Sequence, residues 1–140
     1  MEQFNNQKIA ILGSTGFFGS SFIEKLRYSR IPFIEIGRRD GEFKINLDEE
    51  DMGLRELKNL NINYFINLAA ETDVDLCEKD KKKCFEANFL LVKKLSEFIK
   101  INFKNSTFIH FSTDQVYWGS GPHKENNASF GNYYSECKLM

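Results

Sequence analysis

Three glycines near the start of the chain limit what it can fold into more than any other feature does. Gly13, Gly16 and Gly19 stand between a short apolar run, residues 8–12, and an amphipathic stretch, residues 17–29. Glycines placed this way allow a tight turn, a close approach of the backbone to a pyrophosphate and close helix packing, and the following helix start favours an anion. The spacing lacks the Lys-Ser/Thr ending of an ATP-binding P-loop, and the alternative is an ordinary strand–helix turn. The predicted dinucleotide-binding loop contains Gly13, Thr15, Gly16, Phe17, Phe18 and Gly19.

The rest of the chain alternates short apolar runs with amphipathic stretches. Strands are expected at residues 8–12, 32–36, 62–68 and 106–111, and helices at residues 17–29, 49–59, 84–101 and from Asn132 onward. Such alternation is typical of a parallel sheet with right-handed crossovers. We therefore predict an α/β fold, a Rossmann-type doubly wound parallel sheet, truncated at about four strands in the order 3-2-1-4. No linker interrupts the pattern, so residues 1–140 are expected to form one NAD(P)-binding domain.

Composition places the chain among ordinary globular proteins. Of its 140 residues, 41% are apolar and 28% are charged, which supplies a core and argues against disorder. The net charge of −1 argues against a nucleic-acid binder, which usually has a basic excess. No apolar run approaches the roughly 20 residues of a membrane span, and the polar start does not resemble a signal peptide. We therefore expect a cytoplasmic protein with neither a nucleic-acid nor a membrane partner.

The cysteines are an odd number and are widely spaced. Cys77, Cys84 and Cys137 have neither CxxC spacing nor a nearby histidine. The sequence therefore supports neither a zinc site nor a disulfide framework, and no metal is expected. We interpret all three residues as reduced thiols.

The end of the second expected strand bears on the choice of nicotinamide cofactor. NAD-dependent dehydrogenases usually place an acidic residue there for the adenosine ribose. Here the chain reads Gly37-Arg38-Arg39, and an arginine can bind a 2′-phosphate with its planar fork of donors. We expect NADP(H) to be preferred over NAD(H), with Arg38 before Arg39 as the phosphate contact. The alternative is two solvated loop arginines.

Two later motifs carry groups that can move a proton. Thr113 lies just after the last expected strand, where open α/β sheets hold their ligands. Tyr134 and Lys138 are four residues apart on an expected helix, so their side chains share one face. A free phenol has a pKa of about 10, and a nearby cation favours its ionised form. The sequence therefore predicts a phenol that acts as a proton donor or acceptor.

In this order, the glycine loop, the strand-end Ser-Thr and the YxxxK motif resemble those of the extended short-chain dehydrogenase/reductases. Two segments narrow the likeness to the dTDP-4-dehydrorhamnose reductase family. Residues 66–78, INLAAETDVDLCE, look like that family's INAAAYTAVDKAE stretch, and residues 112–119, STDQVYWG, look like its STDYVFDG stretch. Gly121-Pro122 and Glu125 follow where the family has them. The resemblance runs from Lys8 to the end of the chain.

The resemblance implies a role for each matching residue of the catalytic motifs. Thr113 would hydrogen-bond the reacting oxygen of the substrate. Tyr134 would protonate the keto oxygen as hydride arrives from the nicotinamide. Lys138 would bind the nicotinamide ribose and lower the phenol pKa. These three are the expected catalytic residues, and Tyr134 and Lys138 would also contact the cofactor.

The resemblance also implies cofactor contacts outside those motifs. Ala69 and Ala70 would lie along the cofactor, and Asn46 and Leu47 occupy the place where relatives have Asp-Leu beside the adenine. Asn88 matches an asparagine that related enzymes keep at a helix distortion near the active site. For Asn88 the alternative is a satisfied polar residue in a buried helix.

Two positions depart from the family pattern and leave the identity of the sugar open. Gln115 stands where the family has Tyr, and Trp118 stands where it has Asp. Both positions adjoin the sugar region of the family. Gln115 also supplies no acidic partner for Asp114, which counts against a dehydratase.

The implied function is reduction of a nucleotide-activated 4-keto-6-deoxysugar by NAD(P)H, as in dTDP-rhamnose and polysaccharide biosynthesis. The alternatives are an NDP-sugar epimerase or dehydratase on the same scaffold, or a non-catalytic NADP-binding regulatory module. The intact trio of Thr113, Tyr134 and Lys138 favours catalysis. Family members are about twice as long and carry a C-terminal substrate-binding part, and a homodimer is one form open to the full-length protein. These 140 residues are therefore expected to be a fragment without turnover of its own.

Overall fold

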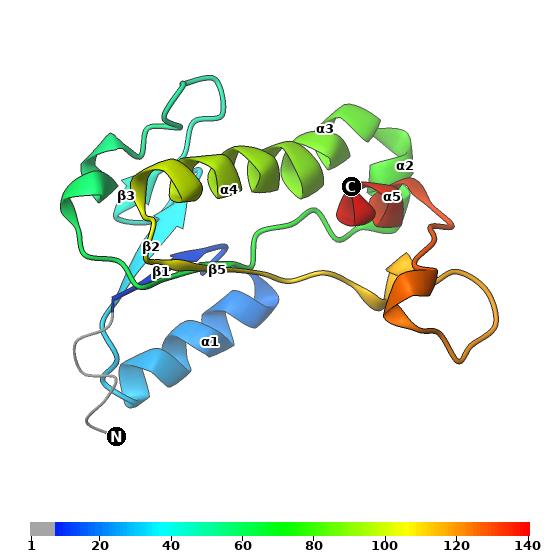
Figure 1. Ribbon diagram of the computed structural model, residues 1–140, viewed down its shortest axis with the longest axis horizontal. Coiled ribbons are helices and arrows are strands. Elements are labelled where there is room, and N and C mark those ends of the chain that lie inside the picture. The colour runs from blue at the N-terminus through cyan, green and yellow to red at the C-terminus, as the bar shows by residue number, and fades with distance from the viewer. Residues whose placement is uncertain (1–7) are drawn as a thin grey trace. The chain divides into compact units, whose positions relative to one another are not determined.

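The computed structural model describes residues 8–140 (Figure 1). The chain divides into two compact units. Unit 1 comprises Met1–Ala69 and Lys94–His110, and unit 2 comprises Ala70–Lys93 and Phe111–Met140.

Unit 1 contains a five-stranded parallel sheet in the order β3-β2-β1-β4-β5. Its strands are β1 (Ile9–Leu12), β2 (Phe33–Gly37), β3 (Phe43–Lys44), β4 (Tyr64–Asn67) and β5 (Thr107–His110). The register places Ile11 between Glu35 of β2 and Ile66 of β4. The expected Rossmann-type order 3-2-1-4 is confirmed, with five strands rather than four. The additional strand is β3. The stretch expected as the third strand along the chain, residues 62–68, is therefore β4 of the structure, and it lies beside β1.

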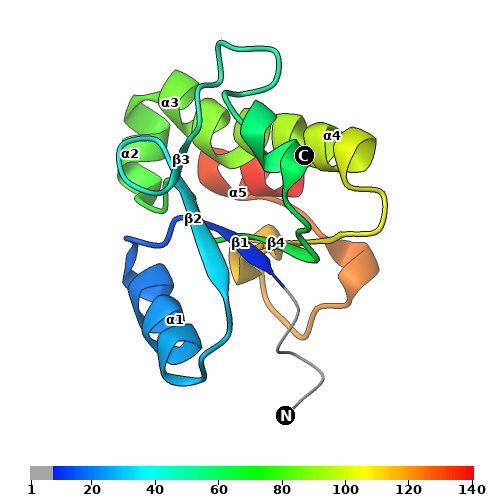
Figure 2. The ribbon, with the colours of Figure 1, turned by 90° about the vertical axis from the view of Figure 1, so that its left-hand side faces the viewer.

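Helices cover both faces of this sheet. Figures 1 and 2 show α1 (Phe17–Tyr28) on one face and α4 (Leu91–Asn102), which belongs to unit 1 from Lys94 on, over the other. Ile23 and Leu26 of α1 pack on Ile11, because residues three apart form one stripe of a helix. On the α4 side, the rings of Phe65 and Phe103 meet edge to face at 4.9 Å. The doubly wound arrangement therefore buries the central strand from both sides.

Unit 2 consists of short helices joined by loops. They are α2 (Val74–Lys79), α3 (Lys81–Phe85) and α5 (Tyr133–Leu139). Asp73 and Asp80 start α2 and α3 by accepting the N–H groups of Leu76 and Lys83 at 2.9 and 3.0 Å. A π-helical segment, Glu86–Leu90, then leads from α3 into α4. The sequence predicts one helix over 84–101; the structure begins that helix earlier and widens it in this segment.

The expected helix at 49–59 is wrong over its first half. Met52 and Gly53 have φ angles of 55° and 70°, a left-handed conformation that a right-handed helix cannot contain. Only Arg55–Asn59 winds, as a short 3₁₀ helix. Within residues 8–140, no helix is long and apolar enough to cross a membrane.

Candidate functional site

The glycine loop joins β1 to α1 within unit 1. Gly13 has a φ of 81°, and a Cβ there would lie 2.6 Å from the backbone nitrogen of Ala69. A Cβ on Gly19 would lie 2.0 Å from the carbonyl oxygen of Gly13. Both positions therefore require glycine for packing alone. The crowding also puts Ala69, an expected cofactor contact, directly against the loop.

The start of α1 suits an anion. Gly16 precedes the helix, no side chain caps it, and the first turn has no acidic residue. Thr15, Phe17 and Phe18 are exposed around it. A 12-residue helix presents N–H groups and the positive end of its dipole at such a start. The loop residues therefore fit the phosphates of a dinucleotide, although their contacts with a cofactor stay predictions.

The loop after β2 carries the two arginines expected near a 2′-phosphate. Gly37 ends the strand, and a Cβ there would lie 2.0 Å from the carbonyl oxygen of Asp40, so the chain turns back sharply. Arg38 and Arg39 are exposed on this turn. Their position permits contact with a ligand, and their role stays a prediction.

The expected adenine contacts lie in the next loop of unit 1. Asn46 accepts the N–H of Asp48 at 3.1 Å and donates to the Glu49 carboxylate at 3.0 Å. The Leu47 carbonyl accepts a hydrogen bond from the Lys94 ammonium. The Asn46 side chain therefore shapes its own loop, and a contact with adenine stays a prediction.

A buried asparagine that sequence reasoning left without a role orders the end of β4. Asn67 is 1% exposed, its Oδ1 accepts the N–H of Ala69 at 3.0 Å, and its Nδ2 lies 3.1 Å from Nδ1 of His110. The residue thus fixes the strand ends of β4 and β5 and the segment that reaches Ala69. Its signal in the sequence is a single polar residue inside an apolar strand.

Unit 2 brings the two expected catalytic hydroxyls together. Thr113 begins a 3₁₀ turn, Asp114–Val116, and its Oγ1 accepts the N–H of Gln115 at 3.3 Å. Tyr134 lies in the first turn of α5, is 6% exposed and hydrogen-bonds the Thr113 side chain. The arrangement combines a phenolic proton donor with a second hydroxyl at the same point.

An effect of Lys138 on the phenol pKa stays a prediction. Burial raises the pKa of Tyr134, and the hydrogen bond with Thr113 lowers it by less. The Lys138 ammonium donates to the carbonyl oxygen of Phe111 at 2.6 Å, and burial lowers the pKa of the lysine. The phenol is consequently held in its protonated form at neutral pH, which suits a proton donor.

Three thiols surround Tyr134. Cys77, Cys84 and Cys137 are buried with it in one apolar cluster, and all are unoxidised. Burial raises the pKa of Cys77 to about 12 and that of Cys137 to about 11. Over residues 8–140, no three His, Cys, Asp or Glu side chains are placed to hold a metal ion. The cluster therefore acts as apolar packing around the phenol.

Asn88 lies in the π-helical segment, where the resemblance places a helix distortion. Its Oδ1 accepts the N–H of Glu71 at 3.1 Å, and its Nδ2 donates to the Glu71 carbonyl at 2.9 Å. Nδ2 also lies 3.3 Å from the Cys84 sulfur. The amide is thus satisfied within unit 2 and orients the segment after Ala70, while direct contact with a cofactor stays a prediction.

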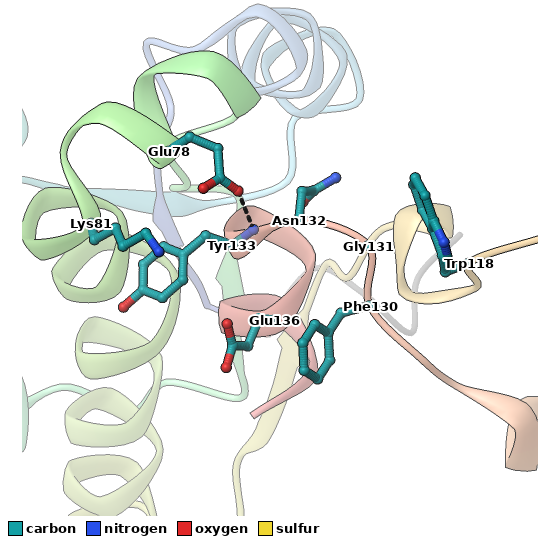
Figure 3. Close-up of a pocket in the computed structure, with 8 residues that line it drawn as sticks. All are labelled: Glu78, Lys81, Trp118, Phe130, Gly131, Asn132, Tyr133 and Glu136. Atoms are coloured by element: carbon teal, nitrogen blue, oxygen red, sulfur yellow. Dashed lines mark hydrogen bonds between the residues drawn. The ribbon is translucent and has the colours of Figure 1, made fainter.

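An open cavity of about 440 Å³ lies in unit 2 beside the start of α5 (Figure 3). Trp118 and Phe130 stand on one side, and Lys81 lies over the ring of Tyr133 at 4.9 Å on the other. The Trp118 indole covers Gly131 so closely that a Cβ there would meet the ring at 1.9 Å. Neither Thr113 nor Tyr134 lines this cavity. Its lining residues are Glu78, Lys81, Trp118, Phe130, Gly131, Asn132, Tyr133 and Glu136.

The relatives of the chain decide its family. The family model described as RmlD substrate binding domain matches residues 7–140. The chain belongs to this family. No curated protein matches it significantly.

Solved structures of similar proteins agree with the RmlD assignment. A hypothetical dTDP-4-dehydrorhamnose reductase from Sulfolobus tokodaii is 28% identical, with a TM-score of 0.79 over 95% of this chain and 50% of that one. The dTDP-4-dehydrorhamnose reductase of Yersinia enterocolitica is 26% identical, with a TM-score of 0.78 over 96% and 46%. RMD from Pseudomonas aeruginosa, solved with NADPH, is 24% identical, with a TM-score of 0.76 over 95% and 45%. This RmlD-family chain thus spans about half the length of the structures it matches.

Proposed function

We propose that these residues are the cofactor-binding part of an NADPH-dependent reductase of nucleotide-activated 4-keto-6-deoxysugars, of the dTDP-4-dehydrorhamnose reductase type. The observation that carries the proposal is the hydrogen bond between Thr113 and the buried Tyr134, in a chain whose first helix begins at a three-glycine loop. The active polypeptide in this proposal also carries a substrate-binding part. NADPH in the related RMD structure and the RmlD family match support the choice of reaction.

The reaction adds a hydride to a keto carbon and a proton to its oxygen. NADPH, when bound, would supply the hydride. Tyr134 donates the proton, because its phenol, whose ordinary pKa of 10.0 is raised further by burial, is protonated at neutral pH. Thr113 hydrogen-bonds the same keto oxygen and so orients it toward the phenol. Lys138, held on the same helix face, binds the ribose of the cofactor in this proposal.

Turnover tests the reaction. Purified protein that carries these residues with the substrate-binding part should oxidise NADPH in proportion to the amount of dTDP-4-keto-6-deoxysugar reduced. Tyr134→Phe should lower kcat by about 100-fold or more with little change in KM, because the phenol acts only on the transition state. Tyr133→Phe is the matched control, since that neighbouring ring faces the cavity. Sugar conversion without net NADPH consumption would contradict a reductase and identify an epimerase.

Cofactor preference tests the two arginines separately from turnover. In the 140-residue chain, Arg38→Ala should reduce the ratio of NADPH to NADH affinity by about 10-fold or more, because a charge-assisted contact to the 2′-phosphate is lost. Fluorescence titration with both nucleotides measures the ratio. Arg55→Ala, which removes an exposed charge that is paired with Asp51, should leave the ratio unchanged. An unaltered ratio in Arg38→Ala would exclude that residue as the 2′-phosphate contact.

A further inference from the structure

A side-chain bridge joins the helix that carries Tyr134 to the turn that carries Thr113. Asn132 Nδ2 donates to Gln115 Oε1 at 3.0 Å. The backbone N–H of Gln115 in turn donates to Thr113 Oγ1 at 3.3 Å. Gln115 stands where the resembled family has Tyr, so the bridge is a property of this chain.

The other end of the bridge determines where α5 begins. Asn132 Oδ1 accepts the N–H of Ser135 at 2.8 Å, and the Ser135 hydroxyl accepts the N–H of Asn132 at 3.3 Å, a reciprocal cap. Ser135 is fully buried. Because Tyr134 is two residues after Asn132, the position of this cap also determines the position of the phenol.

With the hydrogen bond between Thr113 and Tyr134, these contacts form a closed ring. We propose that Gln115 is a positioning residue, which holds the Thr113 hydroxyl against the Tyr134 phenol by anchoring the 3₁₀ turn to the N-cap of α5. A ring of this kind restricts both ends of the Thr113–Tyr134 contact, since neither the turn nor the helix can shift without breaking a bond. The catalytic meaning of the contact rests on the proposed function, but the bridge itself needs no substrate.

A second contact at the same helix start supplies a matched control. Glu78 Oε1 accepts the N–H of Tyr133 at 2.6 Å, as the dashed line in Figure 3 shows. A carboxylate at a helix N-terminus stabilises the helix through its dipole. This bond leads to α2 rather than to the turn of Thr113. Glu78→Gln should therefore weaken the start of α5 without breaking the bridge.

Titration of Tyr134 measures the contact directly, because the hydrogen bond with Thr113 lowers the phenol pKa. The other groups that act on this pKa are Cys77 of α2, Cys84 of α3 and Asp114 of the turn, and the variants below leave all three in place. The protein is labelled with 3-fluorotyrosine, which titrates at lower pH than tyrosine, and followed by fluorine NMR. Tyr134→Phe assigns the signal.

Gln115→Ala should raise the pKa of Tyr134, because the hydrogen bond with Thr113 that lowers this pKa is lost. Asn132→Ser keeps a capping oxygen but is too short to reach Gln115, so it should raise the pKa equally. The double variant should show no further rise, because both changes break one bridge. Glu78→Gln should lower the unfolding temperature and leave the pKa unchanged.

Two results would overturn the proposal that Gln115 positions Thr113. If Gln115→Ala lowers the unfolding temperature but leaves the Tyr134 pKa at its original value, Gln115 stabilises the loop only. Additive effects of Gln115→Ala and Asn132→Ser would also exclude a shared bridge. The titration uses neither cofactor nor substrate, so its outcome and that of the turnover assay are independent.

Discussion

At the residue scale, the glycine loop contains positions where packing requires glycine and one position where packing tolerates a side chain. A Cβ at Gly13 or Gly19 would collide with backbone atoms, whereas a Cβ at Gly16 would lie 3.4 Å from the carbonyl oxygen of Gly13, in ordinary contact. Asn67 shows a second requirement, because its buried amide bonds the backbone of Ala69. Such positions are constrained by the fold before any ligand binds.

Gly19→Ala should lower the free energy of unfolding by about 1–3 kcal/mol, since the added methyl group must displace backbone rather than a flexible side chain. Gly16→Ala should change it by less than about 0.5 kcal/mol, or raise it slightly through unfolded-state entropy. Urea unfolding of the two variants measures the difference. Equal free energies of unfolding for the two variants would show that the close approach of Gly19 to Gly13 does not constrain the folded protein.

At the element scale, the sequence predicts the elements with a clear period and misses those without one. Strands β1, β2, β4 and β5 and helix α1 follow apolar runs or stripes, and each lies within two residues of its expected place. Strand β3 has only two residues, Phe43–Lys44, which is too short to show alternation. The left-handed residues Met52 and Gly53 prevent the first half of the helix expected at 49–59, which composition alone does not reveal.

The candidate site was predictable to a similar extent. The Thr113–Tyr134 pair follows from motifs placed on a strand end and a helix, and the structure joins the two residues. The bond between Asn132 and Gln115 crosses a loop with no periodicity, so no pattern predicts it. The hydrogen bond from the Lys138 ammonium to the Phe111 carbonyl was not predictable either, because a spacing of four residues does not choose between partners.

The π-helical segment gives a prediction at this scale. Asn88→Leu should lower the free energy of unfolding by about 2–4 kcal/mol, because the N–H and carbonyl of Glu71 would both lose their partner. Asn102→Ala removes an asparagine from the end of α4 whose amide donates to the Phe98 carbonyl, and should cost about 1 kcal/mol or less. Thermal or urea unfolding compares the two. A cost for Asn88→Leu no larger than the control would contradict the anchoring role of the amide.

At the scale of the whole molecule, the two units differ in chemistry. Unit 1 holds the sheet and the glycine loop, whereas unit 2 holds the Thr113–Tyr134 pair and all three cysteines. The groups whose pKa is raised most, Cys77 and Cys137, therefore belong to one unit. The response of the protein to alkali should originate there.

Stability should fall as the pH rises from about 9 towards 12. The ordinary thiol pKa is 9.0, and the folded values are about 11 for Cys137 and about 12 for Cys77. Below the ordinary value both states are protonated and the stabilising contribution is complete; above it only the folded state keeps its protons, so the contribution is lost progressively. Each thiol contributes a slope of up to about 1.4 kcal/mol per pH unit.

Urea unfolding at about pH 8 and about pH 10 measures this slope. Cys77→Ala should flatten the dependence, because the variant has no thiol to deprotonate on unfolding. Tyr28→Phe removes an exposed phenol and should leave the slope as it is. If the slope of Cys77→Ala equals that of the unaltered chain, the buried thiol does not contribute to alkaline instability.

The confinement of the cysteines to unit 2 has a practical consequence. A thiol reagent can reach Cys77, Cys84 or Cys137 only when their surroundings transiently open, since each is at most 2% exposed. The rates at which these thiols are modified therefore report how often unit 2, which carries the phenol, transiently opens. Unit 1 has no cysteine, so its own fluctuations do not affect the modification rates.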